Sequence, residues 1–170
     1  MDKILIAPHP KLRQKCNNIE KITNNEINIS KRMIQIMHNA AGVGLAANQI
    51  GILKKIVAIH LIDKEKEEDT TYVLFNPIIT KYSHEKVLME EGCLSFPDQF
   101  AEIERSSSII IKYCNENSEV IEEAKEGYEA RILQHEIDHL YGKLFVDYLS
   151  SLKRNRIINR LKKLKKIVEI

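Results

Sequence analysis

The sequence predicts an α+β fold in which antiparallel β-sheets pack around a central helix that carries the motif HEIDH. Short β-prone runs follow one another closely through the middle of the chain, and strands so near in sequence pair antiparallel. Apolar residues recur with helical spacing before these runs, after them and at the end of the chain. With 170 residues, the chain is expected to form a single domain, 1–170, whose core needs no disulfides.

The first part of the chain is expected to form one helix and one strand. A helical stripe over Asn25–Ala41 predicts the helix, and Gly42 suits the residue just past its end. The β-rich run IVAIHLI predicts a strand over Ile56–Ile62. The charged cluster at Asp63–Asp69 is interpreted as a solvated loop.

The second part of the chain predicts further strands followed by two helices. The runs YVLFNP, KVLM, SIIIKY and EVIEEA are β-prone and are separated by polar turns such as NENS. A helix fits Tyr128–Tyr141 and is closed by Gly142. Residues 149–170 predict an amphipathic basic helix, whose apolar face would carry Ile157, Leu161, Leu164 and Val168.

The composition is that of a soluble globular protein, with 44% hydrophobic and 29% charged residues. No apolar run approaches the ~20 residues of a membrane span, and the N-terminal MDKILIAPHP lacks the apolar core of a signal peptide. No membrane partner and a cytoplasmic or otherwise reducing location are therefore expected. The three widely spaced cysteines are an odd number, which argues against a disulfide framework and leaves one free to bind a metal.

The charge is unevenly distributed. Residues 150–170 contain eight Lys or Arg and one Glu, a net +7, so the rest of the chain carries −5 of the total +2. A packed terminal helix with a solvated basic face accounts for this pattern. Contact of that face with ribosomal RNA is the alternative, although neither aromatic residues nor a nucleic-acid motif supports it. No DNA partner is expected.

The segment QHEIDHLYG, Gln134–Gly142, has a spacing typical of metal-binding helices. His135 and His139 lie four residues apart, on one face of a helix, and Glu136 follows the first histidine. A surface helix whose histidines are satisfied without a metal is the alternative. The apolar surroundings favour the metal, because two buried imidazoles and a buried carboxylate need partners. The apolar neighbours are Ile132, Leu133 and Leu140.

A third ligand is sought in EEGCLSFP, Glu90–Pro97, where Cys93 follows a glycine and lies on a bend that can aim its thiol. Cys16 and Cys114 lie in polar contexts without such a bend and are interpreted as structural. The remaining histidines show no partner pattern and are expected to be ordinary surface or core residues. They are His9, His38, His60 and His84.

The segment GVGLAANQIG, Gly42–Gly51, is interpreted as one wall of a peptide-binding site. Gly42 and Gly44 carry no side chains, so an extended peptide can approach and pair with the backbone as an added strand. A plain glycine turn before a core strand is the alternative. A phosphate-binding loop is excluded, because the G-x-G-x-x-G spacing and a lysine are missing.

Together and in this order, GVGLAANQIG, EGCLS and QHEIDHLYG resemble the three signature blocks of the peptide deformylases, and the ending LFVDYLSSLKRNRI also resembles the bacterial-type enzymes. The resemblance implies removal of the formyl group from the N-terminal formyl-methionine of newly made polypeptides. It also implies one divalent metal, naturally Fe²⁺ and replaceable by Zn²⁺, Ni²⁺ or Co²⁺, with Cys93, His135 and His139 as ligands. Three protein ligands leave a coordination position open, as in catalytic metal sites.

The resemblance further implies roles for residues around the metal. Hydroxide on the metal would attack the formyl carbon while Glu136 acts as general base and then as general acid. The side chain of Gln49 and the backbone N–H of Leu94 would stabilise the oxyanion. Val43, Ile132 and the ring of His135 would form the methionine pocket. The implied substrate-binding residues are Gly42, Val43, Gly44, Glu91, Gly92, Arg131 and Ile132, with Glu91 and Gly92 near the peptide backbone.

Five residues near these motifs carry separate expectations. The stem of Arg131 would line the pocket rim while its charge stays in water. Asp138 is expected to form an ion pair that anchors the helix, with Arg105 as its partner. Phe96 stands where the family usually has a β-branched aliphatic residue, which would alter the lining of the entrance. Phe100 stands where relatives can carry arginine, which would alter recognition of the peptide backbone.

Two rival functions are kept open. A general metallopeptidase would cut internal amides, but its third ligand normally lies downstream, and the chain after Gly142 contains no histidine. The other rival is a binding protein whose basic helix contacts ribosomal RNA and whose metal only stabilises the fold. Release of formate without internal cleavage distinguishes a deformylase from both.

Overall fold

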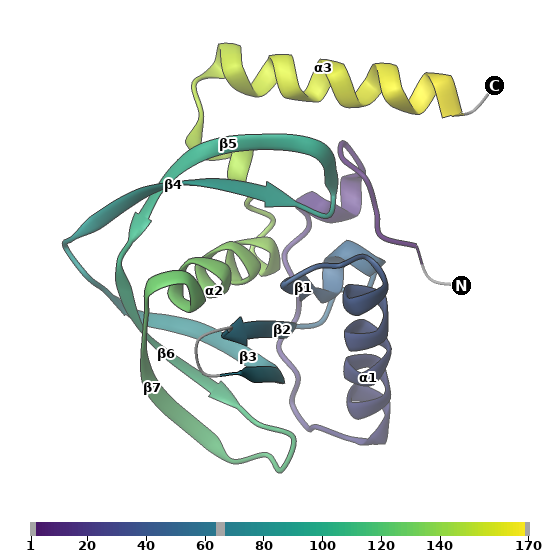
Figure 1. Ribbon diagram of the computed structural model, residues 1–170. Helices are drawn as coiled ribbons and strands as arrows, with labels where there is room; N and C mark the ends of the chain where they lie inside the picture. The colour runs from purple at the N-terminus through teal and green to yellow at the C-terminus, as the bar shows by residue number, and fades with distance from the viewer. Residues whose placement is uncertain (1–2, 64–66, 169–170) are drawn as a thin grey trace.

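The computed structural model describes residues 3–63 and 67–168, which form two antiparallel sheets with helix α2 between them (Figure 1). The larger sheet has the strand order β1-β2-β3-β6-β7, and the smaller sheet pairs β4 with β5. The α+β class and the central helix are therefore confirmed. In chain order the elements are η1 (Pro10–Arg13), α1 (Asn24–Asn39), β1 (Gly44–Ala46), η2 (Ala47–Ile50), β2 (Ile56–Asp63), β3 (Glu68–Tyr82), β4 (Lys86–Cys93), β5 (Phe96–Ser106), β6 (Ser108–Cys114), β7 (Val120–Glu126), α2 (Gly127–Leu140), η3 (Phe145–Tyr148) and α3 (Ser151–Val168), where η marks a 3₁₀-helix.

Helix α1 begins at a capping box. The N-cap side chain of Thr23 accepts a hydrogen bond from the N–H of Asn25, and the carboxylate of Glu26 accepts the backbone N–H of Thr23 at 3.0 Å. Glu26 also accepts the Thr23 hydroxyl at 2.5 Å and forms an ion pair with Lys54. These contacts join the start of α1 to the chain that leads into β2.

Replacing Glu26 by glutamine is expected to destabilise the protein by about 1–3 kcal/mol at pH 7, because its charged hydrogen bonds are lost. The Lys54 ammonium and the Thr23 hydroxyl hold the pKa of the Glu26 carboxyl well below its ordinary value. A carboxyl with a lowered folded-state pKa stabilises above its unfolded pKa, and that stabilisation is lost as the pH falls through the folded value. Denaturant titrations should show the wild-type advantage shrinking below pH ~4. A pH-independent difference would contradict this explanation.

The end of α1 differs from the prediction at one residue. The helix stops at Asn39, and Ala41, not Gly42, takes the left-handed backbone after it, with φ 51°. The assignment of Gly42 to that position is therefore wrong. A Cβ at Gly42 would lie 2.6 Å from Cδ1 of Leu94, so the glycine makes room for the segment that follows Cys93.

The hairpin of β2 and β3 extends further than the sequence predicts. Asp63 pairs with Glu68 and Ile62 with Asp69, so both ends of the expected loop Asp63–Asp69 belong to strands. Residues 64–66, the middle of that expected loop, lie outside the described part of the chain. Strands β1 and β5 were not predicted, although both border the site described below.

Helix α2 packs one face into a core formed by β2, β3 and β6 and ends where the sequence predicts. Gly142 has φ 72°, and its N–H donates to the carbonyl of His139 at 3.0 Å. A Cβ at this position would lie 2.3 Å from the carbonyl oxygen of Arg13, so a side chain here would clash with backbone. The turn thus fixes the C-terminal end of α2 against the N-terminal segment.

Helix α3 runs along the outer side of β5 (Figure 1). Its apolar side chains at Ile157 and Leu161 are buried in one cluster with Phe145. Leu164, placed on the same face by the sequence, is 44% exposed, and the side chain of Val168 lies outside the described part of the structure. In the described part of the chain, no helix is long and apolar enough to cross a bilayer.

Candidate metal centre and its surroundings

Cys93, His135 and His139 come together between the two sheets. One potential ligand atom from each residue lies within 4.8 Å of the other two. The Sγ of Cys93 is 3.3 Å from Nε2 of His139, and the two imidazole rings are 5.0 Å apart between centroids. The predicted cluster of one thiol and two histidines is therefore present. Among the described residues it is the one group of this kind, and no other cysteine or histidine joins it.

The local folding of two segments explains how these ligands meet. The two histidines are one helical turn apart on α2, so both rings lie on the same face. Cys93 is the last residue of β4, at a register shift in the β4–β5 hairpin, where Gly92 pairs with Phe100 but Cys93 pairs with Phe96. Such irregularities turn a strand and redirect its side chains. Here the irregularity coincides with the thiol that lies beside the rings.

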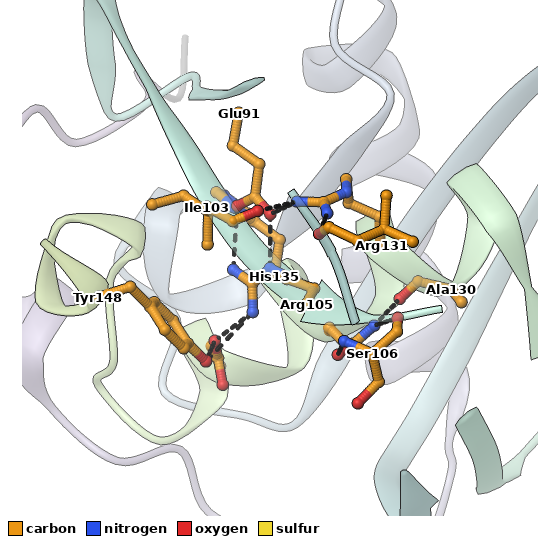
Figure 2. Close-up of polar contacts among 11 residues, drawn as sticks. Glu91, Ile103, Arg105, Ser106, Ala130, Arg131, His135 and Tyr148 are labelled. Atoms are coloured by element: carbon orange, nitrogen blue, oxygen red, sulfur yellow. Dashed lines mark hydrogen bonds and ion pairs between the residues drawn. The ribbon is translucent and has the colours of Figure 1, made fainter. Parts of the chain in front are cut away.

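His135 is held by a buried network of charged side chains (Figure 2). Its Nδ1 lies 3.0 Å from Oε2 of Glu91, and Arg105 donates two hydrogen bonds to the same carboxylate, at 2.5 and 3.0 Å. Burial raises the pKa of Glu91, but the hydrogen bonds from His135 and Arg105 outweigh it and lower the pKa to about 2. The carboxylate is therefore ionised at neutral pH and fixes the ring so that Nε2 is free to bind a metal.

Two of the expected substrate-binding residues, Arg131 and Glu91, belong to this network and also line the pocket described below. Arg131 is 5% exposed and donates to Glu91 at 2.6 Å and to the carbonyls of Ile103 and Val87. The expectation that its charge stays in water is therefore wrong. The carboxylate of Glu91 likewise contacts His135 and the two arginines, so its side chain supports the ring.

The predicted ion pair between Asp138 and Arg105 is confirmed. Nη1 of Arg105 donates to Oδ2 of Asp138 at 2.8 Å, and the hydroxyl of Tyr148 donates to the same oxygen at 2.7 Å (Figure 2). Arg105 thereby joins a residue of α2 to the carboxylate that orients His135. Tyr148 extends the connection to η3, the segment before α3.

His139 is buried, with 1% of its surface exposed. Burial lowers the pKa of its imidazole well below the ordinary value. The ring is therefore neutral at pH 7, which is the form that binds metals. One thiol and two imidazoles form a donor set that suits Zn²⁺ and other divalent transition metals.

Glu136 is buried beside the cluster and is not part of it. Its Oε2 has no hydrogen-bond partner among the described residues. Burial raises the pKa of its carboxyl to about 7, a value suited to proton transfer at neutral pH. A Cβ at Gly44 would lie 2.5 Å from Oε1 of Glu136. Gly44 therefore leaves the space that this carboxyl occupies, a role that the sequence did not reveal.

Gln49 lies beside the thiol of Cys93. Its Nε2 points toward Sγ of Cys93 at 3.6 Å and donates to Oγ of Ser95 at 3.2 Å, while its Oε1 accepts the N–H of Ala46 at 2.8 Å. The amide is thus held at both ends beside the cluster. Leu94 follows the cysteine, between β4 and β5. Its side chain packs against the hydrophobic core that includes Met33 and Met37 of α1.

A small pocket of about 90 Å³ opens beside the cluster. Its lining includes Val43, Glu91, Gly92, Arg131, Ile132 and His135. Tyr128 also lines it and was not predicted.

The two phenylalanines noted in the sequence differ in their placement. Phe96 does not line an entrance, since it is 1% exposed and packs edge-on against Phe145 at 5.1 Å between ring centroids. That expectation is wrong. Phe100 is 62% exposed, and its ring covers Gly92, where a Cβ would lie 2.7 Å from Cε1. It is therefore a surface residue beside the pocket.

A three-ligand cluster on an α+β fold, with a neighbouring buried carboxyl and a pocket, defines a metal-dependent hydrolase. Comparisons with known proteins identify the family of metal-dependent hydrolases to which this chain is similar. The family model for polypeptide deformylase matches residues 1–155. The peptide deformylase of Rhizobium meliloti strain 1021 is 41% identical over 160 residues, which cover 94% of this chain and 91% of the relative.

Solved structures agree. The crystal structure of peptide deformylase from Ehrlichia chaffeensis has a TM-score of 0.93 at 34% identity and covers 98% of both chains. The structure of the same enzyme in complex with actinonin has a TM-score of 0.89 at 36% identity, over 94% of this chain and 95% of that one. The chain belongs to the polypeptide deformylase family and is an enzyme of that family.

Proposed function

We propose that this protein removes the formyl group from the N-terminal formyl-methionine of newly synthesised polypeptides and releases formate. The observation that carries the proposal is the placement of the Glu136 carboxyl and the Gln49 amide around the thiol and imidazoles of one cluster, beside a pocket lined by Val43 and Ile132. Deformylation needs a proton carrier and an oxyanion donor at one centre. The family membership supports the same reaction.

Each side chain has a defined part in this chemistry. A divalent metal held by Cys93, His135 and His139 would supply Lewis-acid activation at an open coordination position. Glu136 accepts a proton from the attacking water and passes it to the nitrogen of the leaving methionine, so the amide C–N bond breaks with formate and a free amine as products. The Nε2 of Gln49 and the backbone N–H of Leu94 donate to the oxyanion that forms on the formyl group.

The substrate is proposed to bind as an extended strand. Gly42, Val43 and Gly44 offer backbone on one side and Gly92 on the other, and the methionine side chain enters the pocket.

Fe²⁺ is the proposed resident metal, with Zn²⁺, Ni²⁺ or Co²⁺ able to replace it. The cytoplasm, or a reducing organelle in which formylated chains are made, is the proposed location, because the thiol ligand must stay reduced. Residues 1–170 are proposed to act as one catalytic domain.

A single assay separates this proposal from its rivals. The protein, purified without oxygen and loaded with Ni²⁺, is incubated with formyl-Met-Ala-Ser, and formate and peptide products are both measured. Formate together with intact Met-Ala-Ser is the expected result. Internal fragments would indicate a metallopeptidase, and the absence of any product from a metal-loaded protein would overturn the enzymatic proposal.

Replacing Gly44 by alanine is expected to lower kcat for formate release by about 10²-fold, because displacement of a reacting group by ~1 Å has that effect. The added Cβ would meet the carboxyl of Glu136 at 2.5 Å. Metal content should not change. In a Glu136→Gln background the same alanine should have little further effect, since the two changes act on one group. Equal effects in both backgrounds would show that Gly44 acts through something other than this carboxyl.

Contact with the ribosome is proposed for the basic face of α3. Arg156, Arg160 and Lys163 line the same exposed groove on this helix, while Ile157 and Leu161 hold it to the body. Such a face favours an anionic partner such as ribosomal RNA. Co-sedimentation with ribosomes that weakens as salt increases is the expected result, and binding that is absent at low salt would refute the contact.

A further inference from the structure

Two buried polar atoms near the last turn of α2 lack hydrogen-bond partners among the described residues. They are Nδ1 of His139 and Oδ1 of Asn48. His139 is 1% exposed and Asn48 is fully buried. Buried polar side-chain atoms in folded proteins nearly always have a partner, so an unpaired acceptor and an unpaired ring nitrogen in one place call for a reason.

The two residues are in direct contact. Nδ2 of Asn48 donates to the carbonyl oxygen of His139 at 2.6 Å, and that oxygen also accepts the N–H of Gly142 at 3.0 Å. Carbonyls in the last turn of a helix have no partner within the helix, so outside donors fix its geometry. Asn48 belongs to η2, whose next residue is Gln49. The side chain therefore joins the helix end that carries His139 to the segment that carries Gln49.

The contrast with the other histidine shows what His139 needs. A histidine that binds a metal through Nε2 carries its proton on Nδ1 and almost always donates it to an oxygen, which fixes the ring. His135 has such an acceptor in Glu91 at 3.0 Å. The Nε2 of His139 is the atom beside the Cys93 thiol, at 3.3 Å, so its Nδ1 is the atom left to donate. Asn48 already holds the backbone of this residue and has a free acceptor.

We propose that Asn48 is the positioning residue for His139: its amide N–H fixes the backbone of this ligand, and its side-chain oxygen accepts the Nδ1–H proton through one bridging water. Asn48 thus does for His139 what Glu91 does for His135, with a neutral side chain in place of an ionised one. The proposal rests on the metal site of the proposed function, but its readout is metal retention, so it can fail while formate release stands.

The test compares metal release from two variants. Asn48→Ala removes the hydrogen bond to the His139 carbonyl and the proposed acceptor for its Nδ1–H. Asn76→Ala is the matched control, because Asn76 also uses both side-chain polar atoms to bond a backbone, that of Ile19, at 2.8 Å each, and these bonds do not involve the metal cluster. Both proteins are loaded with Co²⁺ or Zn²⁺, and release to a chelator is timed alongside the melting temperature.

The expected result is that Asn48→Ala releases metal about 10–100-fold faster than the wild type, the usual effect of losing an outer partner of a ligand. The visible spectrum of its Co²⁺ form should also change. Asn76→Ala should lower the melting temperature without altering release or spectrum. Release from Asn48→Ala within threefold of the wild type, or an equal acceleration in Asn76→Ala, would overturn the proposal.

A measurement on the unmodified protein covers the case in which Asn48→Ala does not fold. In the Zn²⁺-loaded wild type, nitrogen-edited NMR should show the Nδ1–H of His139 protected from solvent exchange and close in space to the side-chain amide protons of Asn48. A rapidly exchanging proton, or one with no proximity to Asn48, would refute the assignment.

Discussion

Replacing Glu136 by glutamine is expected to lower kcat/KM for formate release by about 10²–10⁴-fold while the metal stays bound, since this is the usual contribution of a positioned general acid or base. Glutamine has nearly the same shape but cannot carry the proton. The carboxyl is buried, and its Oε2 has no partner among the described residues, so no structural contact of that atom is lost. Formate kinetics and metal stoichiometry, measured on the same preparation, test this expectation.

The matched control for this variant is Glu129→Gln. Glu129 lies on the same helix but hydrogen-bonds Tyr72 and forms an ion pair with Lys125, away from the cluster. Its replacement should leave formate release near the wild-type rate. Activity of Glu136→Gln within about threefold of the wild type, or loss of its metal, would contradict the assignment of Glu136 as the proton carrier.

Replacing Cys93 by alanine is expected to abolish both metal binding and formate release. Losing an outer partner of a ligand typically reduces metal affinity by about 10–100-fold, and the loss of one of three ligands should exceed that. Metal content after gel filtration and affinity from chelator competition measure the effect. The protein should remain folded, because the thiol lies at the edge of the buried cluster that includes Phe96 and Phe145.

Cys114→Ala is the control for the loss of a thiol. Cys114 lies at the end of β6, outside the metal cluster, and should be replaceable without loss of metal. Retention of one metal per chain by Cys93→Ala would contradict the proposed ligand set. Equal loss in both variants would point to oxidation or unfolding in place of ligation.

Local patterns in the sequence predict those parts of the fold that depend on local structure. The period of apolar residues places α1 and α2 within two residues of their ends. Gly142 could be predicted as the end of α2 because its left-handed backbone is a local property of the turn. Strand β5 was missed because its run FPDQFAEIERS is rich in charged residues. Residues such as Ile103 and Arg105 bury one face of this strand. The strand itself forms by pairing with β4 and has no strong local signal of its own.

In the site, too, the sequence predicts the features that depend on local structure and misses those that depend on distant contacts. The spacing of His135 and His139 follows from one helix, so the sequence contains it. Contacts between distant segments have no local signal. Gly44 makes room for Glu136, and Asn48 bonds the carbonyl of His139 across 91 positions of the chain. No pattern around these residues predicts either contact.

The surroundings of two residues were predicted incorrectly, because contacts with distant segments determine them. The charge of Arg131 was expected in water because an arginine stem can line an apolar rim while its guanidinium stays solvated, but three acceptors from other segments satisfy its buried charge. Phe96 was expected to alter the lining of the entrance because it stands where the family usually has a β-branched aliphatic residue. The register shift at Cys93 turns it into the core instead, against Phe145.

The binding of a single metal by one sulfur and two imidazole nitrogens is tested most directly by X-ray absorption spectroscopy of the Zn²⁺-loaded protein. The arrangement of Cys93, His135 and His139 predicts one sulfur at ~2.3 Å and two imidazole nitrogens at ~2.0–2.1 Å from the zinc. The sulfur shell should disappear in Cys93→Ala and persist in Cys114→Ala. A zinc shell without sulfur in the wild type would contradict this account of the site.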